Sequence, residues 1–206
     1  GRAVQNLINI EPDDKIKAYI RTNDLKDQEY INKMNVVMIT KNGTIKKTSL
    51  EAYSRPRTNG VNAIEIRDND QLLGARLTDG NSEIMIATKD GKCIRFPEEK
   101  ARAVGRGSIG VRGITLSEGD EVIGMIVVND VQNETVLVVA ERGYGKRTAV
   151  EDYRITNRGV KGVITLYITE KTGNLIAIQM VTDDDGLMII NKSGVAIRMG
   201  MDEMRV

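Results

Sequence analysis

The chain repeats itself about every 50 residues, and this internal period limits the folds open to it more than any other feature. Four polar pairs each end in a glycine: Gly43, Gly91, Gly143 and Gly194. These glycines recur at intervals of 48, 52 and 51 residues. A short apolar run rich in β-branched residues precedes each of them: 36–39, 84–87, 136–139 and 187–190. Such runs favour strands, and each glycine predicts a hairpin turn with positive φ.

Two further elements keep the same period. A Gly-Val segment starts at Gly60, Gly110 and Gly159, with a degenerate earlier copy at 6–10. Another predicted strand opens in each repeat: 14–18, 70–74, 120–124 and 173–177. We interpret the extra polar stretch at 23–35 as a loop insertion, and no amphipathic helical segment separates the strands.

Four short strands per repeat at this period predict blades arranged around an axis. We therefore expect an all-β, propeller-like disc of four-stranded antiparallel blades. The whole chain would form a single repeat domain, a partial ring with about four repeats of ~50 residues. The repeats that we assign are 1–59, 60–109, 110–158 and 159–206.

Composition excludes several functions. The chain has no histidine, so the commonest general base and most zinc sites are absent. Cys93 is the only cysteine, which argues for a reducing, cytoplasmic compartment and for a small, buried side chain in a strand. No apolar run approaches the ~18 residues that a membrane-spanning helix needs. The start lacks the apolar core of a signal peptide, so we expect it to lie inside a longer protein.

Basic residues recur at matched places, although the net charge is only +1. The fourth position after each turn glycine is basic: Lys47, Arg95, Arg147 and Arg198. Neighbouring positions and the loops that follow add more: Lys46, Lys146, Arg55, Arg57, Arg102, Arg106, Arg154, Arg158, Arg112 and Lys161. On superposable blades they would form a belt around the perimeter. A belt of this kind neutralises phosphates, which predicts binding of double-stranded DNA without sequence preference.

Plainer interpretations stand beside this one. The basic residues could be ordinary solvated strand ends, since Lys and Arg are common on any surface. Tyr53 and Tyr153 each lie ten residues after their turn glycine, where they could pack at a blade edge or stack on DNA. We favour packing for both.

No catalytic or metal motif is complete. The acidic run 183–186 lacks the alternating ligands of a calcium loop and is predicted to be a turn. The glycine-rich stretch 105–110 has no helix pattern after it and no Lys-Ser/Thr pair, so it is not a nucleotide loop. We expect no catalytic centre, metal or cofactor in this chain.

The motifs 143–148, 158–163, 51–57 and 120–124 closely resemble those in the family of C-terminal domains of the DNA gyrase A protein, and the similarity runs through the whole chain. The resemblance implies a β-pinwheel, a disc whose blades exchange strands and whose basic perimeter binds and bends DNA. It also implies partners: the gyrase B subunit, together with the rest of the gyrase A subunit, in an A2B2 enzyme. That whole enzyme is an ATP- and magnesium-dependent type II topoisomerase that introduces negative supercoils, with its catalytic centres outside this chain.

The sequence departs from this family in two places. The basic, glycine-rich box of the first family blade, which resembles Gln-Arg-Arg-Gly-Gly-Lys-Gly, does not occur here and would fall upstream. The fourth repeat also ends before its own Gly-Val segment, and the family's ring has five or six blades. The alternatives are the C-terminal domain of a topoisomerase IV A subunit, which shares the repeat, and a protein-binding propeller of the WD40 or kelch type.

Overall fold

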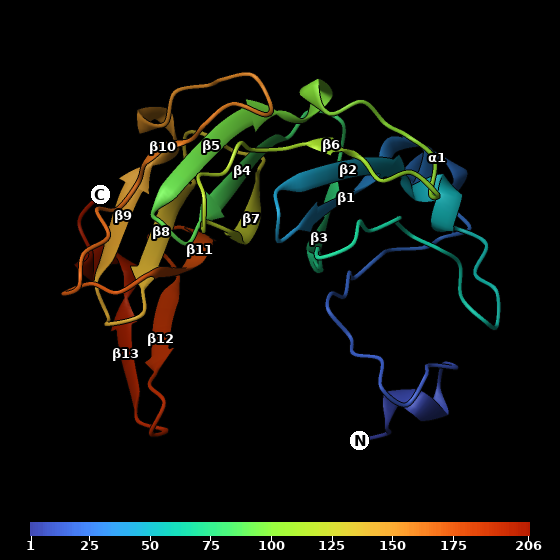
Figure 1. The fold of residues 1–206 in the computed structure, drawn as a ribbon, viewed down its shortest axis with the longest axis horizontal. Helices are drawn as coiled ribbons and strands as arrows, with labels where there is room; N and C mark the ends of the chain where they lie inside the picture. The colour runs from blue at the N-terminus through green and yellow to red at the C-terminus, as the bar shows by residue number, and fades with distance from the viewer.

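The computed structural model describes residues 1–206, whose strands form antiparallel sheets that follow one another along an arch (Figure 1). Sheet 1 has the order β3 (Leu72–Thr78), β1 (Asn35–Thr40), β2 (Thr44–Ser49), β6 (Val111–Arg112). Sheet 2 has the order β7 (Val122–Val128), β4 (Glu83–Thr88), β5 (Lys92–Pro97), β10 (Val163–Ile164). Sheet 3 contains β11 (Leu175–Val181), β8 (Thr135–Ala140) and β9 (Gly145–Ala149), and sheet 4 is the hairpin β12 (Gly186–Ile190) and β13 (Ala196–Gly200).

In sheets 1 and 2, the last strand comes from a part of the chain that follows the hairpin of the next sheet. β6 follows the hairpin of sheet 2 in sequence, yet it pairs with β2 of sheet 1. β10 follows the hairpin of sheet 3 and pairs with β5 of sheet 2. The strands β3, β7 and β11 lie on the concave side of the arch, which we call the inner edge, and β6 and β10 lie on the convex side, the outer edge (Figure 1). The predicted all-β pinwheel with exchanged strands is confirmed.

The turn glycines behave as the sequence predicts. Gly43, Gly91, Gly143 and Gly194 have φ values of 89°, 82°, 85° and 86°. This left-handed conformation closes a hairpin after each apolar run because it matches the twist of the paired strands. Short 3-10 helices follow the hairpins: η2 (Leu50–Tyr53), η3 (Glu98–Lys100), η4 (Val150–Asp152) and η5 (Met201–Glu203).

Outside the first hairpin, the part of the chain before β3 departs from the prediction. The stretch 23–35 is not only a loop, because it holds the helix α1 (Gln28–Lys33). Asp27 caps this helix by accepting a hydrogen bond from Tyr30 N, and Ile31 anchors it by burial. The predicted strands at 6–10, 14–18 and 60–64 are absent, and only the 3-10 turn η1 (Val4–Asn6) forms near the start. No helix has the length and apolar character to cross a membrane.

Aliphatic side chains fill the space between consecutive sheets. Ile39 and Ile45 of sheet 1 pack against Ile86 and Phe96 of sheet 2. The junction of sheets 2 and 3 is built in the same way from Met85 and Val138 with their neighbours. The closest backbone approach between sheets runs along β3, β7 and β11, so the sheets are tightly joined at the inner edge. The outer edge must therefore be held by other means.

Candidate nucleic-acid interface

Two return segments, residues 101–112 and 153–164, cover the outer edge. Each leaves a 3-10 helix and runs back across the preceding sheet before it becomes that sheet's last strand. Ala103 makes a parallel bridge to Lys47, and Val104 N donates to Lys47 O at 2.8 Å. The second segment repeats the contact, with Ile155 beside Arg95 and Thr156 N donating to Arg95 O at 2.9 Å. The repeat in sequence thus becomes a repeat of surface straps.

Most of the predicted loop positions have exposed side chains, and four of them belong to the return segments: Arg102, Arg112, Arg154 and Lys161. The following basic residues are exposed: Arg55, Arg57, Arg102, Arg112, Lys146, Arg154, Lys161 and Arg198. Arg112 belongs to the outermost strand β6, and Lys161 comes just before β10. Arg106 and Arg158 are half-buried. Arg158 donates through Nη1 to Arg112 O at 2.5 Å and through Nε to Lys100 O at 3.0 Å, so it joins its own return segment to the one before.

A groove of about 770 Å³ lies beside the hairpin turn of sheet 1. Arg67, Arg112 and Arg158 line it together with Asp68 and Asp70. The Asp70 carboxylate is occupied, because it accepts hydrogen bonds from Asn42 N and Gln71 N at 3.0 and 2.8 Å. With three guanidinium groups against two carboxylates, the lining of this groove carries a formal charge of +1.

The basic residues that lie four positions after each turn glycine do not together form such a surface. Lys47, Arg95 and Arg147 are only 8, 5 and 5% exposed. The expectation that they face outward on the perimeter is wrong for these three, and among the register only Arg198 is exposed. The physical reason is that the central strands lie between neighbouring sheets and are buried on both faces, as Cys93 to Phe96 show. Arg95, two residues after Cys93, shares the face that packs against sheet 3.

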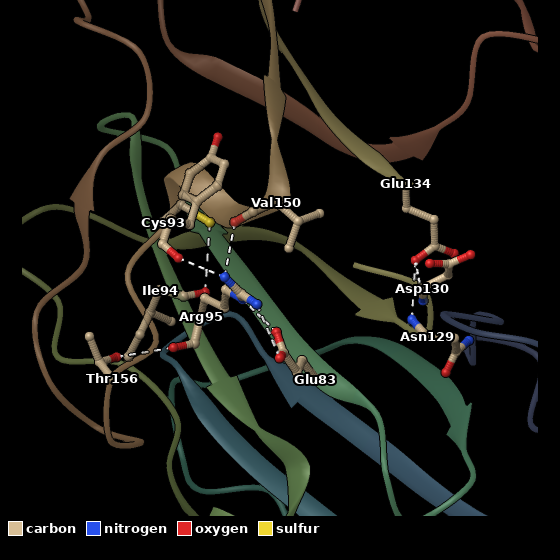
Figure 2. A network of polar contacts seen from close by, with 10 residues as sticks. Glu83, Cys93, Ile94, Arg95, Asn129, Asp130, Glu134, Val150 and Thr156 are labelled. Atoms are coloured by element: carbon tan, nitrogen blue, oxygen red, sulfur yellow. Dashed lines mark hydrogen bonds and ion pairs between the residues drawn. The ribbon is translucent and has the colours of Figure 1, made fainter. Parts of the chain in front are cut away.

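Arg95 is held between two sheets (Figure 2). Its guanidinium makes a bidentate ion pair with Glu83 of its own sheet, with Nε–Oε2 at 2.5 Å and Nη2–Oε1 at 3.1 Å. Its Nη1 donates to the carbonyls of Val150 and Tyr153 in sheet 3, at 3.1 and 2.9 Å. These carbonyls lie at the two ends of the η4 turn. The Arg95 side chain thus pairs with the Glu83 carboxylate of its own sheet and connects that sheet to the next.

The same contact recurs at both neighbouring junctions. Lys47 Nζ donates to Glu98 O, the first residue of η3, at 3.0 Å and lies 3.6 Å from Glu98 Oε2. Arg147 Nη1 donates to Met201 O and Met204 O around η5, at 2.9 and 3.3 Å. We call Lys47, Arg95 and Arg147 the clip residues. Each reaches from one sheet to the 3-10 turn of the next.

Arg198 holds the corresponding place in sheet 4, and none of its side-chain atoms makes a hydrogen bond. The partner that Glu83 supplies in sheet 2 is replaced here by Gly186, which has no side chain. The Arg198 side chain is therefore exposed, whereas the three earlier members of the register are buried.

The expectation that Lys46 faces outward on the perimeter is also wrong, because this residue is only 1% exposed. Its Nζ donates to Ala63 O at 2.6 Å and to Arg106 O, tying two arginine-bearing segments together. Burial lowers the pKa of Lys46, and the charge of Arg106 lowers it further. Lys146, its counterpart on β9, is exposed.

Both tyrosines pack against the protein, as predicted. Tyr153 is buried and its hydroxyl contacts Thr165 Oγ1 at 2.5 Å, while the Tyr53 hydroxyl donates to Ala63 O at 2.9 Å. Burial raises the pKa of both phenols. The acidic run lies at a turn, as predicted, although its last residue, Gly186, already begins β12. Asp183 pairs with Arg147 Nη2 at 2.7 Å.

Sequence reasoning overlooked the acidic and carbonyl partners of the clip residues. The parity of the strand was the available signal: a position predicted to be buried, Cys93, implies that Arg95 points the same way. Glu83 was a second signal, since it stands diagonally across the hairpin from Arg95. The carbonyl acceptors come from the 3-10 turn that follows the next hairpin, about 50 residues away, and they leave no comparable mark in the local sequence.

Comparison with known proteins gives a consistent result. Residues 35–79, 82–129 and 134–182 each match the model of the DNA gyrase C-terminal domain, β-propeller family. The DNA gyrase A subunit of Staphylococcus aureus strain NCTC 8325 is 44% identical over 204 residues, which is 99% of this chain and 22% of that protein. The chain therefore spans about a fifth of the length of the curated relatives it matches.

Two solved structures share the fold. A crystal structure of the C-terminal domain of DNA topoisomerase IV superposes with a TM-score of 0.87 at 25% identity, covering 100% of this chain and 62% of that one. A structure of the DNA gyrase A C-terminal domain superposes with a TM-score of 0.84 at 24% identity, covering 98 and 66%.

Proposed function

This chain belongs to the DNA gyrase C-terminal domain family, and we propose on that basis that it binds double-stranded DNA along its outer edge and bends it, with little preference for sequence. The observation that carries the proposal is the row of exposed basic side chains on the two return segments and the strands that end them. Evenly repeated charges suit a phosphate backbone, which is itself a repeat.

The arch supplies the shape for bending. Smooth bending of a 20–30 base-pair site through 40–90° costs on the order of 1–6 kcal/mol, so contacts must be distributed along the arc to hold the DNA. Successive return segments present Arg102 and Arg106, then Arg154 and Arg158, at matched places in the repeat. A duplex that follows the convex side would meet these groups in turn.

The DNA-binding proposal is tested with a fluorescent duplex and a salt titration. With roughly six phosphate contacts, the log of the association constant should fall with a slope of about −5 against the log of salt concentration. Unrelated duplex sequences of equal length should bind alike. An affinity that does not respond to salt, or a strong preference for one sequence, contradicts the proposal.

We extend the proposal to the whole protein through its relatives. There the chain would act beside a gyrase B subunit, with the rest of a gyrase A subunit, in an A2B2 enzyme in the cytoplasm that uses ATP and magnesium to supercoil DNA. The chain alone should neither cleave nor relax supercoiled plasmid, with or without ATP and magnesium. Reproducible relaxation by a nuclease-free preparation of this chain would contradict that division of labour.

A further inference from the structure

The clip residues have a role that their charge alone does not suggest. They are basic and recur with the repeat, as phosphate-binding residues would, but their side chains are buried between sheets. Every hydrogen-bond donor position used by Arg95 is directed at Glu83 or at a carbonyl of sheet 3. Four of its five N–H groups are thus used, and the side chain is too deeply buried to present the fifth to DNA.

Their position gives them control over the outer edge. The inner edge is fixed by the close packing of β3, β7 and β11, while at the outer edge consecutive sheets are joined through side chains and return segments. The length of the side chain from β5 to the carbonyls of η4 therefore limits how far sheets 2 and 3 can splay apart. A change there would therefore alter the angle between the two sheets, with the closely packed inner edge as the axis.

The backbone of the same residues seats the return segments. Lys47 O accepts from Val104 N and Arg95 O accepts from Thr156 N, and Thr156 Oγ1 adds a second bond to Arg95 O at 3.2 Å (Figure 2). The exposed Arg102 and Arg154 lie one residue before the bridges to Lys47 and Arg95. Lys47 and Arg95 thus each connect three parts: their own sheet, the next sheet, and the return segment that bears exposed arginines.

We propose that Lys47, Arg95 and Arg147 are positioning residues that set the angle between consecutive sheets and so the curvature of the DNA path, without contacting DNA themselves. This inference rests on the proposed DNA-binding function. It separates two kinds of basic residue in one repeat: exposed ones that provide affinity, and buried ones that determine the bend.

The test uses the full chain with two variants of the middle clip. Arg95→Lys keeps the charge but lacks the bidentate fork, and Lys47 shows that this register accepts lysine. Glu83→Gln with Arg95→Met removes both buried charges together, so that neither remains unpaired. Met38→Ala, in the apolar cluster on the far side of sheet 1, is the control for loss of stability with the clips intact. Arg102→Ala, exposed on the return segment, is the control for loss of a DNA contact.

Two measurements are made on folded protein. Spin labels at Glu99→Cys and Glu151→Cys, which lie on η3 and η4 and are exposed, report the separation of sheets 2 and 3 at the outer edge without DNA. Energy transfer on an end-labelled long duplex reports bending, and titration of a duplex that spans a single junction reports affinity. Cys93 stays in place because it is buried.

We expect both clip variants to shift or broaden the Glu99–Glu151 distance and to reduce transfer on the long duplex. Their affinity for the short duplex should stay within about twofold, since the exposed phosphate contacts remain. Met38→Ala should leave distance and bending as in the parent, and Arg102→Ala should weaken binding without moving the labels. Clip variants that keep the parental distance and bend long DNA like the parent overturn the proposal. A parent chain that neither binds nor bends DNA overturns the proposed function instead, and the label distance still decides whether the clips set the angle.

Discussion

At the scale of single residues, burial decides chemistry that the sequence leaves open. Cys93 is 1% exposed, and burial raises its pKa from the ordinary 9.0 to about 12. Folding thus favours the protonated thiol over the thiolate, which makes the stability of the protein depend on pH. The stabilisation is complete below about pH 9 and is lost as the pH rises toward 12. We expect the native thiol to resist a thiol-reactive dye at neutral pH and to react once the chain is unfolded.

The same residue gives a control for the pH effect. The alkaline loss of stability assigned to the thiol should be missing from Cys93→Ala, when the urea midpoints of the two chains are compared across that pH range. Rapid labelling of the native parent would mean that the junction of sheets 2 and 3 opens more readily than its packing indicates.

Arg95 and Arg198 occupy the same register but should respond differently to truncation. Arg95→Ala leaves Glu83 and two carbonyls without their partner, and breaking a buried pair in this way costs about 3–5 kcal/mol. Arg198→Ala removes an exposed side chain that makes no hydrogen bond, and it should change stability by less than about 0.5 kcal/mol. Thermal or urea unfolding of the two variants measures the difference. Equal losses of stability in the two variants would show that the contacts of Arg95 do not stabilise the fold.

At the scale of elements, equivalent turns differ in what surrounds them. Gly91 and Gly143 have nearly the same φ, 82° and 85°, but a Cβ at Gly91 would overlap Leu166 O, whereas nothing lies within 4 Å at Gly143. Gly143→Ala should cost about 1–2 kcal/mol for the left-handed backbone alone. Gly91→Ala should cost a further ~1–3 kcal/mol, because it also displaces the chain just after β10.

Unfolding midpoints of the two glycine variants check this difference, which should amount to roughly 2–4 °C for each kcal/mol in a chain of this size. Gly143→Ala serves as the control for backbone strain. If both variants lose the same stability, the exchanged strand contributes nothing at that turn.

The elements also show what sequence reasoning can reach. The hairpins are predictable because an apolar run, a polar pair and a glycine encode strand, turn and strand locally. The helix α1 is missed because its mostly polar sequence has no helical repeat of apolar residues. Only the capping residue Asp27 and the buried Ile31 indicate a helix there. The burial of the clip residues is missed because a basic side chain is ordinarily expected to face solvent. The carbonyl groups that accept their hydrogen bonds belong to the following repeat. Pairings that depend on a distant segment cannot be found from one repeat alone.

At the scale of the whole molecule, the exposed and buried basic residues should contribute separately to DNA binding. Arg112→Ala with Lys161→Ala removes two outer-edge charges, and it should lower affinity for all duplexes alike and reduce the magnitude of the salt slope by about 2. Arg76→Ala, an exposed arginine on the inner strand β3, is the matched control and should leave the slope unchanged. A loss of slope with Arg76→Ala instead would place the DNA on the concave side.

Strand exchange has a consequence for how the protein is made. As the chain leaves the ribosome, β2 emerges long before β6, and β3, β4 and β5 must all appear in between. At about 5–20 residues per second, the first sheet waits several seconds with its outer hydrogen-bonding edge bare. The second sheet waits in the same way for β10. An unpaired strand edge can pair with other chains. During synthesis, the sheet most prone to misassembly is therefore the one before the sheet that is currently being made.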